Sequence, residues 1–132
     1  MTGHNHTVVW IDHREARVFH FSAEEVDRLI VWPNDPHVHI HHKAQTIGSG
    51  HAPEDQAFLH AVVEAIGASK AILVTGPGVA KMELVKHIAR HDPAVIDRIA
   101  GIETADHPSD GALVAHARAY FRAAGRMTPQ KQ

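Results

Sequence analysis

The sequence contains no cysteine, and it has few of the features that assign a protein to a special class at once. Disulfides, thiolate zinc sites and cysteine nucleophiles are therefore excluded, which fits a reducing cytoplasm. Only 5% of the residues are aromatic, and the longest apolar runs, such as residues 71–74, are far too short to span a bilayer. Residues 1–10 also lack the charged and apolar blocks of a secretion signal. We expect a cytoplasmic protein that does not engage a membrane.

An excess of basic residues is also lacking, because 13 Lys and Arg face 15 Asp and Glu. No broad phosphate-attracting field is expected, so a contact with nucleic acid would need a local patch. What stands out instead is a set of 14 histidines, which would take the net charge from −2 to roughly +9 at pH 6. We interpret the high histidine content as drift toward a polar residue that the surface tolerates, rather than as a designed pH sensor.

The length of 132 residues, with 44% hydrophobic and 21% charged residues, indicates one globular domain. No internal repeat or Ser/Gly-rich linker divides the chain. We assign residues 1–125 to a single domain and residues 126–132 to a polar C-terminal tail.

The first third of the chain has the signature of β-structure. Apolar runs rich in β-branched and aromatic residues predict strands, separated by short polar turns, at residues 7–11, 16–21 and 29–32. Turns this short favour an antiparallel meander. Residues 12–15 are one of these hairpin turns.

From Pro53 onward the apolar period becomes helical. The pattern predicts a helix ended by Gly67, a buried strand at 70–75, a helix up to Asp92, a further helical turn, a strand at 99–104 and a helix opened by Pro108. The fold class is therefore α/β: a mixed five-stranded sheet of three antiparallel strands followed by β-α units, with helices on the faces, as in ribonuclease H-like proteins.

Four stretches in this order carry a resemblance to a known family. They are VVWIDHREARVFHF, the glycine loop TIGSGH, AILVTGPGVAKMEL and DHPSDGAL, and they extend over about residues 6–124. The chain resembles the middle domain of the archaeal and eukaryotic peptide-chain release factors and their relative pelota. The resemblance implies a fold of the translational machinery component type and a role at the ribosome. It also implies that this chain is the middle domain without the codon-reading and partner-binding domains of its relatives.

The loop before the first helix is where release factors of this family carry Gly-Gly-Gln. The matching positions here are Gly48, Ser49, Gly50 and His51, and Gly-Gly-Gln occurs nowhere in the sequence. Pelota-type members also lack the tripeptide, so the resemblance implies ribosome or RNA binding without peptide release. The residues expected to contact RNA or another partner are His41, His42, Lys43, Gly48, Ser49, Gly50, His51 and Lys81.

A metal-binding alternative rests on the run HVHIHHK, residues 37–43. If it is extended, His37, His39 and His41 project from one face, close enough for two imidazoles to share a zinc ion. The competing interpretation is a polar strand face open to water, with no cofactor. His87 and His91, four apart on a helix, allow a weaker site of the same kind, and a solvated helix face is the competing interpretation there.

Gly76-Pro77-Gly78 follows a buried strand and opens a helix. Backbone N–H groups at such a start can hold an anion, so Gly76 and Gly78 are candidate anion-binding residues, with Lys81 nearby. A nucleotide P-loop is not indicated, because Gly-Lys-Ser/Thr is missing. A tight turn is the alternative interpretation.

Two enzymatic alternatives stay open. Asp12 follows the first strand, where ribonuclease H-like nucleases begin a carboxylate cluster for magnesium, but the later strand ends in Thr75 rather than an acid. Ser49 and Ser109 lie near histidines, yet no Gly-x-Ser-x-Gly elbow is present. The sequence favours a non-enzymatic domain that binds the ribosome or structured RNA, with pairing of two copies through sheet edges also possible.

Overall fold

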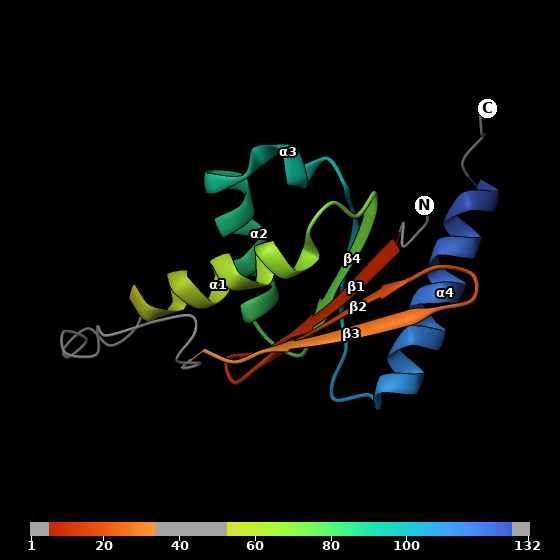
Figure 1. Cartoon of the computed structure of the whole chain (residues 1–132), viewed down its shortest axis with the longest axis horizontal. Helices are drawn as coiled ribbons and strands as arrows, with labels where there is room; N and C mark the ends of the chain where they lie inside the picture. Colours follow the sequence, from red (N-terminus) through yellow and green to blue (C-terminus); the bar gives the residue numbers. More distant parts are fainter. Residues whose placement is uncertain (1–5, 34–52, 128–132) are drawn as a thin grey trace.

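A computed structural model describes residues 6–33 and 53–127 of the chain (Figure 1). Its centre is a five-stranded sheet with the strand order β3-β2-β1-β4-β5. The strands are β1 (His6–Ile11), β2 (Ala16–Phe21), β3 (Val26–Val31), β4 (Ala71–Gly76) and β5 (Ile99–Thr104). The pairs β1–β2 and β2–β3 are antiparallel, whereas β1–β4 and β4–β5 are parallel. The predicted mixed sheet is confirmed.

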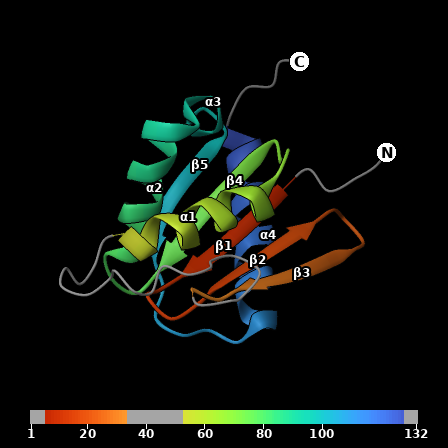
Figure 2. The ribbon, with the colours of Figure 1, turned by 60° about the vertical axis from the view of Figure 1, so that its left-hand side comes forward.

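Helices cover both faces of this sheet (Figure 2). One face carries α1 (Pro53–Ile66), α2 (Ala80–His91) and the short α3 (Pro93–Ile96), and the other carries α4 (Asp110–Met127). Within the part of the chain that the structure describes, no helix combines the length and apolar character needed to cross a membrane.

Alternating strand residues divide the core into two layers. On the side of α1 and α2, Val9, Ile11 and Val18 pack against buried residues of these helices. In α1 these residues recur at helical spacing: Phe58, Leu59, Val62, Val63 and Ile66. On the other side, Val8, Trp10, Phe19, Phe21 and Leu73 pack against Leu113 and Ala117 of α4. β4 is buried on both faces, as its unbroken apolar sequence predicts.

One strand boundary differs from the sequence prediction. β3 begins at Val26 rather than at Leu29, because Val26, Asp27 and Arg28 pair with Phe21, His20 and Phe19 of β2. Side chains in the first part of this edge strand are exposed, so polar residues are tolerated there. Because of these polar residues, the sequence lacks the apolar pattern that would predict a strand. The turn shrinks to residues 22–25, where the Ser22 Oγ accepts from the N–H groups of Glu24 and Glu25 at 3.3 and 3.2 Å.

A buried polar cluster joins β1, β2 and the end of α1. The Thr7 hydroxyl lies 2.9 Å from His20 Nδ1 and also hydrogen-bonds to the Ser69 hydroxyl. His20 Nε2 donates to the Ala65 carbonyl at 2.6 Å, and the Ser69 Oγ donates to the Ile66 carbonyl at 2.9 Å. These contacts satisfy hydroxyls that would otherwise be costly to bury, and they fix the strand–helix junction.

Candidate functional site

Several turns meet at the end of the sheet where the parallel strands β1, β4 and β5 finish. We call this end the carboxyl rim and define it by residues 12–15, 77–81 and 105–110. Since helices α2 and α4 begin here, the positive ends of their dipoles point toward the same side. The end of β3 and the start of α1 also lie on this side (Figure 1). Ligand sites of open α/β sheets form at such ends.

Asp12 shapes the first of these turns. Its Oδ1 accepts from the N–H groups of Arg14 and Glu15 at 2.8 and 3.0 Å, and the Asp12 N–H donates to the Glu15 carbonyl at 3.0 Å. The turn therefore uses the Asx geometry that favours aspartate, and the hairpin interpretation of residues 12–15 is confirmed.

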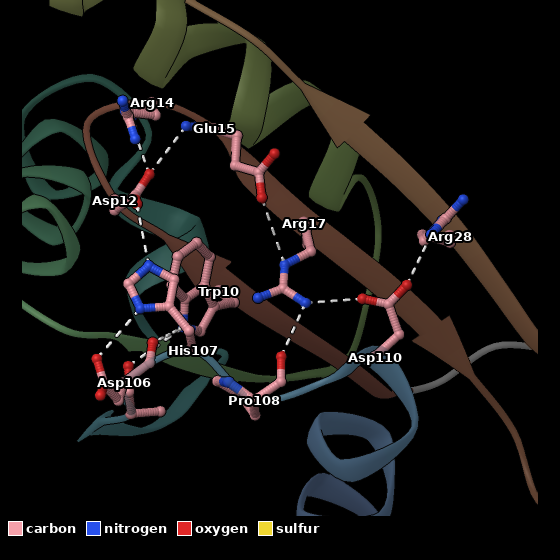
Figure 3. A network of polar contacts seen from close by, with 11 residues as sticks. Trp10, Asp12, Arg14, Glu15, Arg17, Arg28, Asp106, His107, Pro108 and Asp110 are labelled. Atoms are coloured by element: carbon pink, nitrogen blue, oxygen red, sulfur yellow. Dashed lines mark hydrogen bonds and ion pairs between the residues drawn. The ribbon is translucent and has the colours of Figure 1, made fainter.

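Arg17, whose side chain is 11% exposed, and Asp110 form an ion pair at the carboxyl rim (Figure 3). Arg17 Nη1 donates to Asp110 Oδ1 at 2.7 Å and to the Pro108 carbonyl at 3.1 Å. Arg28 Nη1 reaches Asp110 Oδ2 at 2.6 Å. The hydrogen bond from Arg17, with a smaller effect from Arg28, holds the pKa of the Asp110 carboxyl below its ordinary value. The carboxylate thus joins β2 and β3 to the start of α4.

Trp10 and His107 hold the loop that follows β5. The indole Nε1 of Trp10 donates to the carbonyls of Ala105 and Asp106 at 3.2 and 2.9 Å, and its ring contacts the imidazole of His107. The guanidinium of Arg17 lies 4.5 Å from the centre of the Trp10 ring. His107 lies between two carboxylates, 3.1 Å from Asp106 Oδ1 and 3.7 Å from Asp12 Oδ2. The loop after β5 is therefore held in place by side chains of β1 and of the turn that follows it.

The predicted anion-binding turn lies beside this loop. A Cβ on Gly76 would collide with the Ile11 carbonyl oxygen, so glycine lets the ends of β4 and β1 approach closely. A Cβ on Gly78 would meet nothing within 4 Å. Lys81 Nζ donates to the Gly78 carbonyl at 2.6 Å, and the N–H groups of Met82 and Glu83 bond to the Val79 carbonyl. Anion binding at Gly76 and Gly78 stays a prediction.

One of the two histidines of α2 differs from the expectation of a solvated face, whereas His91 is exposed as that expectation has it. His87 is only 7% exposed, because α2 packs this side chain against α1, where the His87 Nδ1 lies 2.9 Å from Gln56 Oε1. The His87 Nε2 is buried and makes no hydrogen bond with the described residues. Burial, followed by the positive potential of His91 and His60, lowers the pKa of His87. The pattern of apolar residues did not predict the burial of His87, because histidine is counted as a polar residue.

Most of the residues predicted to bind a partner lie outside the described residues. This holds for His41, His42, Lys43, Gly48, Ser49, Gly50 and His51, and for the metal candidates His37 and His39 with His41. Of the predicted partner-binding residues, Lys81 is described, and it lies at the carboxyl rim. These assignments stay predictions.

The carboxyl rim carries positive groups beside the carboxylates of Asp12 and Asp106. Arg14 is exposed in the first turn, and Lys81 lies in the first turn of α2. Among residues 6–33 and 53–127, no three His, Asp or Glu side chains are placed to hold a metal ion. Ser109 serves as the N-cap of α4, where its Oγ accepts from the Ala112 N–H at 3.1 Å. The described residues therefore give the nuclease and serine hydrolase alternatives no support.

The strand order and the distribution of the helices define the class of this fold. It is the fold of a pelota- or release-factor-like middle domain, so the resemblance seen in the sequence is confirmed at the level of the fold. A scan against protein-family models finds no match, and a search of curated proteins finds none either.

Three solved structures are similar to the chain over most of its length. Pelota from Archaeoglobus fulgidus has a TM-score of 0.59 with 12% identity over 86% of this chain, and Pelota from Thermoplasma acidophilum has 0.58 with 20% identity over 89%. Dom34 from S. cerevisiae, a translation termination-like factor, has 0.58 with 11% identity over 90%. The matched regions are 30%, 31% and 34% of those proteins, so the chain spans about a third of their length.

Proposed function

We propose that this chain is a translation-associated domain that binds the ribosome, or another structured RNA, without catalysing peptide release. The observation that carries the proposal is the shared fold, which extends over about nine-tenths of the chain in Pelota and Dom34. Dom34 is described as involved in RNA quality control and as interacting with Hbs1. By this proposal the chain works in the cytoplasm, where ribosomes are.

The carboxyl rim is the contact surface in this proposal. The exposed Arg14 and the Lys81 ammonium offer positive charge there, beside the N-termini of α2 and α4. His41, Lys43 and His51, which are predicted to touch the partner, come between β3 and α1 in the sequence, and β3 ends and α1 begins on this side. Because the formal net charge is −2, a local patch is needed. In this proposal Arg14 and Lys81 provide it, among the carboxylates of Asp12 and Asp106 on the same side.

The absence of Gly-Gly-Gln supports a binding role over release chemistry. His51 follows the glycines, and its imidazole differs in shape and hydrogen bonding from the glutamine amide that positions water in release factors. We therefore propose that the chain acts by binding to a surface of the ribosome or of an RNA, and not by catalysing peptide release.

Co-sedimentation with purified ribosomes tests the proposal. We expect the chain to sediment with ribosomes at about 50 mM salt and to dissociate progressively toward about 200 mM. The double variant Arg14→Gln/Lys81→Gln should bind about tenfold more weakly, with a shallower salt dependence. The matched control is Lys86→Gln/Arg90→Gln, which removes the same two charges from exposed positions on α2 away from the rim and should bind like the unmodified chain.

Failure to sediment even at the lowest salt would contradict the proposal as a whole. Equal weakening by both double variants would contradict the assignment of the contact to the carboxyl rim, because it would indicate a response to net charge alone.

A further inference from the structure

A pocket lies at the opposite end of the sheet from the carboxyl rim. It has a volume of about 350 Å³ and is formed by the start of β1, the end of β2 with its turn, and the last turns of α4. Its lining residues are His6, Phe21, Ser22, Ala23, Arg118, Phe121 and Arg122. Sites for small organic ligands begin at about 300 Å³, so this pocket can take a ligand the size of a single nucleotide.

One wall of the pocket is aromatic. The His6 ring lies with its centre 4.5 Å from that of Phe121 and 5.9 Å from that of Phe21, and the two phenylalanine rings are 6.0 Å apart. Burial lowers the pKa of His6 below its ordinary value of 6.5, which favours the neutral ring. His6 and Phe121 are partly buried and can contact a flat, unsaturated ring, whereas Phe21 is 2% exposed and supports them from the core.

Two arginines provide the charge. Arg118 and Arg122 are four residues apart on α4, so both project from the same helix face. Arg118 Nη1 donates to the carbonyls of Ser22 and Ala23 at 2.6 and 3.1 Å, which fixes its guanidinium 5.3 Å from the centre of the Phe21 ring. Arg122 is exposed. None of the seven lining residues carries a carboxylate, although the adjoining turn contains Glu24 and Glu25.

We propose that this pocket binds one nucleotide unit, with the base stacked against His6 and Phe121 and the phosphate held by Arg122 and Arg118. Guanidinium groups bind phosphate oxygens with paired hydrogen bonds, and aromatic rings accept any base, so the site selects for a phosphorylated base rather than for a sequence. The unit comes either from a free nucleotide or from a single-stranded stretch of RNA. Because the pocket lies away from the carboxyl rim, this inference stands apart from the ribosome contact.

Titration of the full chain followed by NMR of the aromatic side chains tests the pocket. The probes are AMP, a short single-stranded RNA with a 5′ phosphate, and adenosine without phosphate. We expect shifts of the His6, Phe21 and Phe121 resonances with the phosphorylated probes and much weaker binding of adenosine. If AMP saturates the pocket, a free nucleotide is sufficient as the ligand. If only the RNA binds, the ligand is a nucleotide within single-stranded RNA.

Matched variants make the test specific. Arg122→Gln should weaken binding about tenfold, the loss expected for one charge-assisted hydrogen bond, and Phe121→Leu should weaken it about fivefold through lost stacking. Arg90→Gln removes an exposed arginine from α2 and should leave binding unchanged. If Phe121→Leu does not fold, Arg122→Gln decides alone, because its side chain is on the surface.

The inference is overturned if neither phosphorylated probe shifts these resonances at about millimolar concentration, or if Arg122→Gln binds like Arg90→Gln. Its failure is distinguishable from failure of the proposed function, because ribosome binding is probed by Arg14→Gln/Lys81→Gln at the other end of the sheet. Variants of the pocket can lose nucleotide binding while they keep ribosome binding, and variants of the carboxyl rim can lose ribosome binding while they keep nucleotide binding.

Discussion

At the scale of single residues, the Asp110 carboxylate has the strongest set of contacts at the carboxyl rim. It accepts from Arg17 at 2.7 Å and from Arg28 at 2.6 Å, and the Arg17 side chain is only 11% exposed. The buried Arg17 Nε makes no hydrogen bond with the described residues, and Glu15 Oε2 lies 3.6 Å from it. Asp110 is therefore the main compensation for a guanidinium that is largely removed from water.

Replacing Asp110 by Asn should lower the free energy of unfolding. We expect a loss of about 1 kcal/mol at pH 7, since a hydrogen bond to a charged group is weakened by the partial exposure of this carboxylate. Asp97→Asn, at an exposed position after α3, is the control and should change stability little. Urea unfolding followed by circular dichroism measures both.

The same contact predicts a dependence on acid. Since the pKa of Asp110 is lowered in the folded state, its contribution is complete above the ordinary value of 3.8 and is lost as the pH falls through the folded pKa. The unmodified chain and Asp110→Asn should thus converge in stability below about pH 4. A constant difference across that range would contradict the assigned ion pairs.

His87 should make the protein sensitive to milder acid. Its pKa is lowered mainly by burial, so below the ordinary value of 6.5 the unfolded chain binds a proton that the folded chain resists. Stability should therefore fall as the pH drops from about 7.5 to about 5.5, and His87→Asn should fall less over this range.

Thermal unfolding at several pH values measures this dependence. His116→Asn, which changes an exposed histidine of α4, is the control and should not reduce the loss. If His87→Asn loses as much stability in acid as the unmodified chain, the burial of His87 against α1 is wrong.

At the scale of the secondary-structure elements, the close approach of β4 to β1 depends on a missing side chain. Gly76→Ala would place a Cβ against the Ile11 carbonyl oxygen, and backbone atoms cannot move aside as a flexible side chain can. We expect a loss of about 3 kcal/mol in the free energy of unfolding. Gly78→Ala, two residues on and in open space, should stay within about 0.5 kcal/mol. Equal effects in urea unfolding would contradict the packing of the two strand ends.

The elements also show what local sequence can reveal. β1, β2 and β4 are clear because their apolar residues are buried in the sheet, and α1 is clear because its buried residues recur at helical spacing. The start of β3 was missed because an edge strand needs backbone pairing but little burial. In such a strand Asp27 and Arg28 look like turn residues.

At the scale of the whole molecule, the sites depend on contacts that the sequence does not mark. Arg17 and Asp110 are 93 positions apart, and Arg28 and Asp110 are 82 apart. The nucleotide pocket likewise joins His6 and Phe21 to Phe121, and no local pattern links these residues. Apolar patterning and turns sufficed to predict the fold class, and the order of the four stretches carried the family resemblance. Sites need distant side chains to be brought together, which the sheet order achieves.

The central claim is that the carboxyl rim faces ribosomal RNA. The lack of cysteine allows a direct measurement, in which an RNA-cleaving iron chelate is attached to a single introduced cysteine. His13→Cys places the probe at the rim, where the native side chain is 60% exposed, and Ala94→Cys places it on α3. The account predicts cleavage of ribosomal RNA at defined positions from residue 13 and little from residue 94. Cleavage from residue 94 alone, or from neither position in ribosome-bound chain, would contradict it.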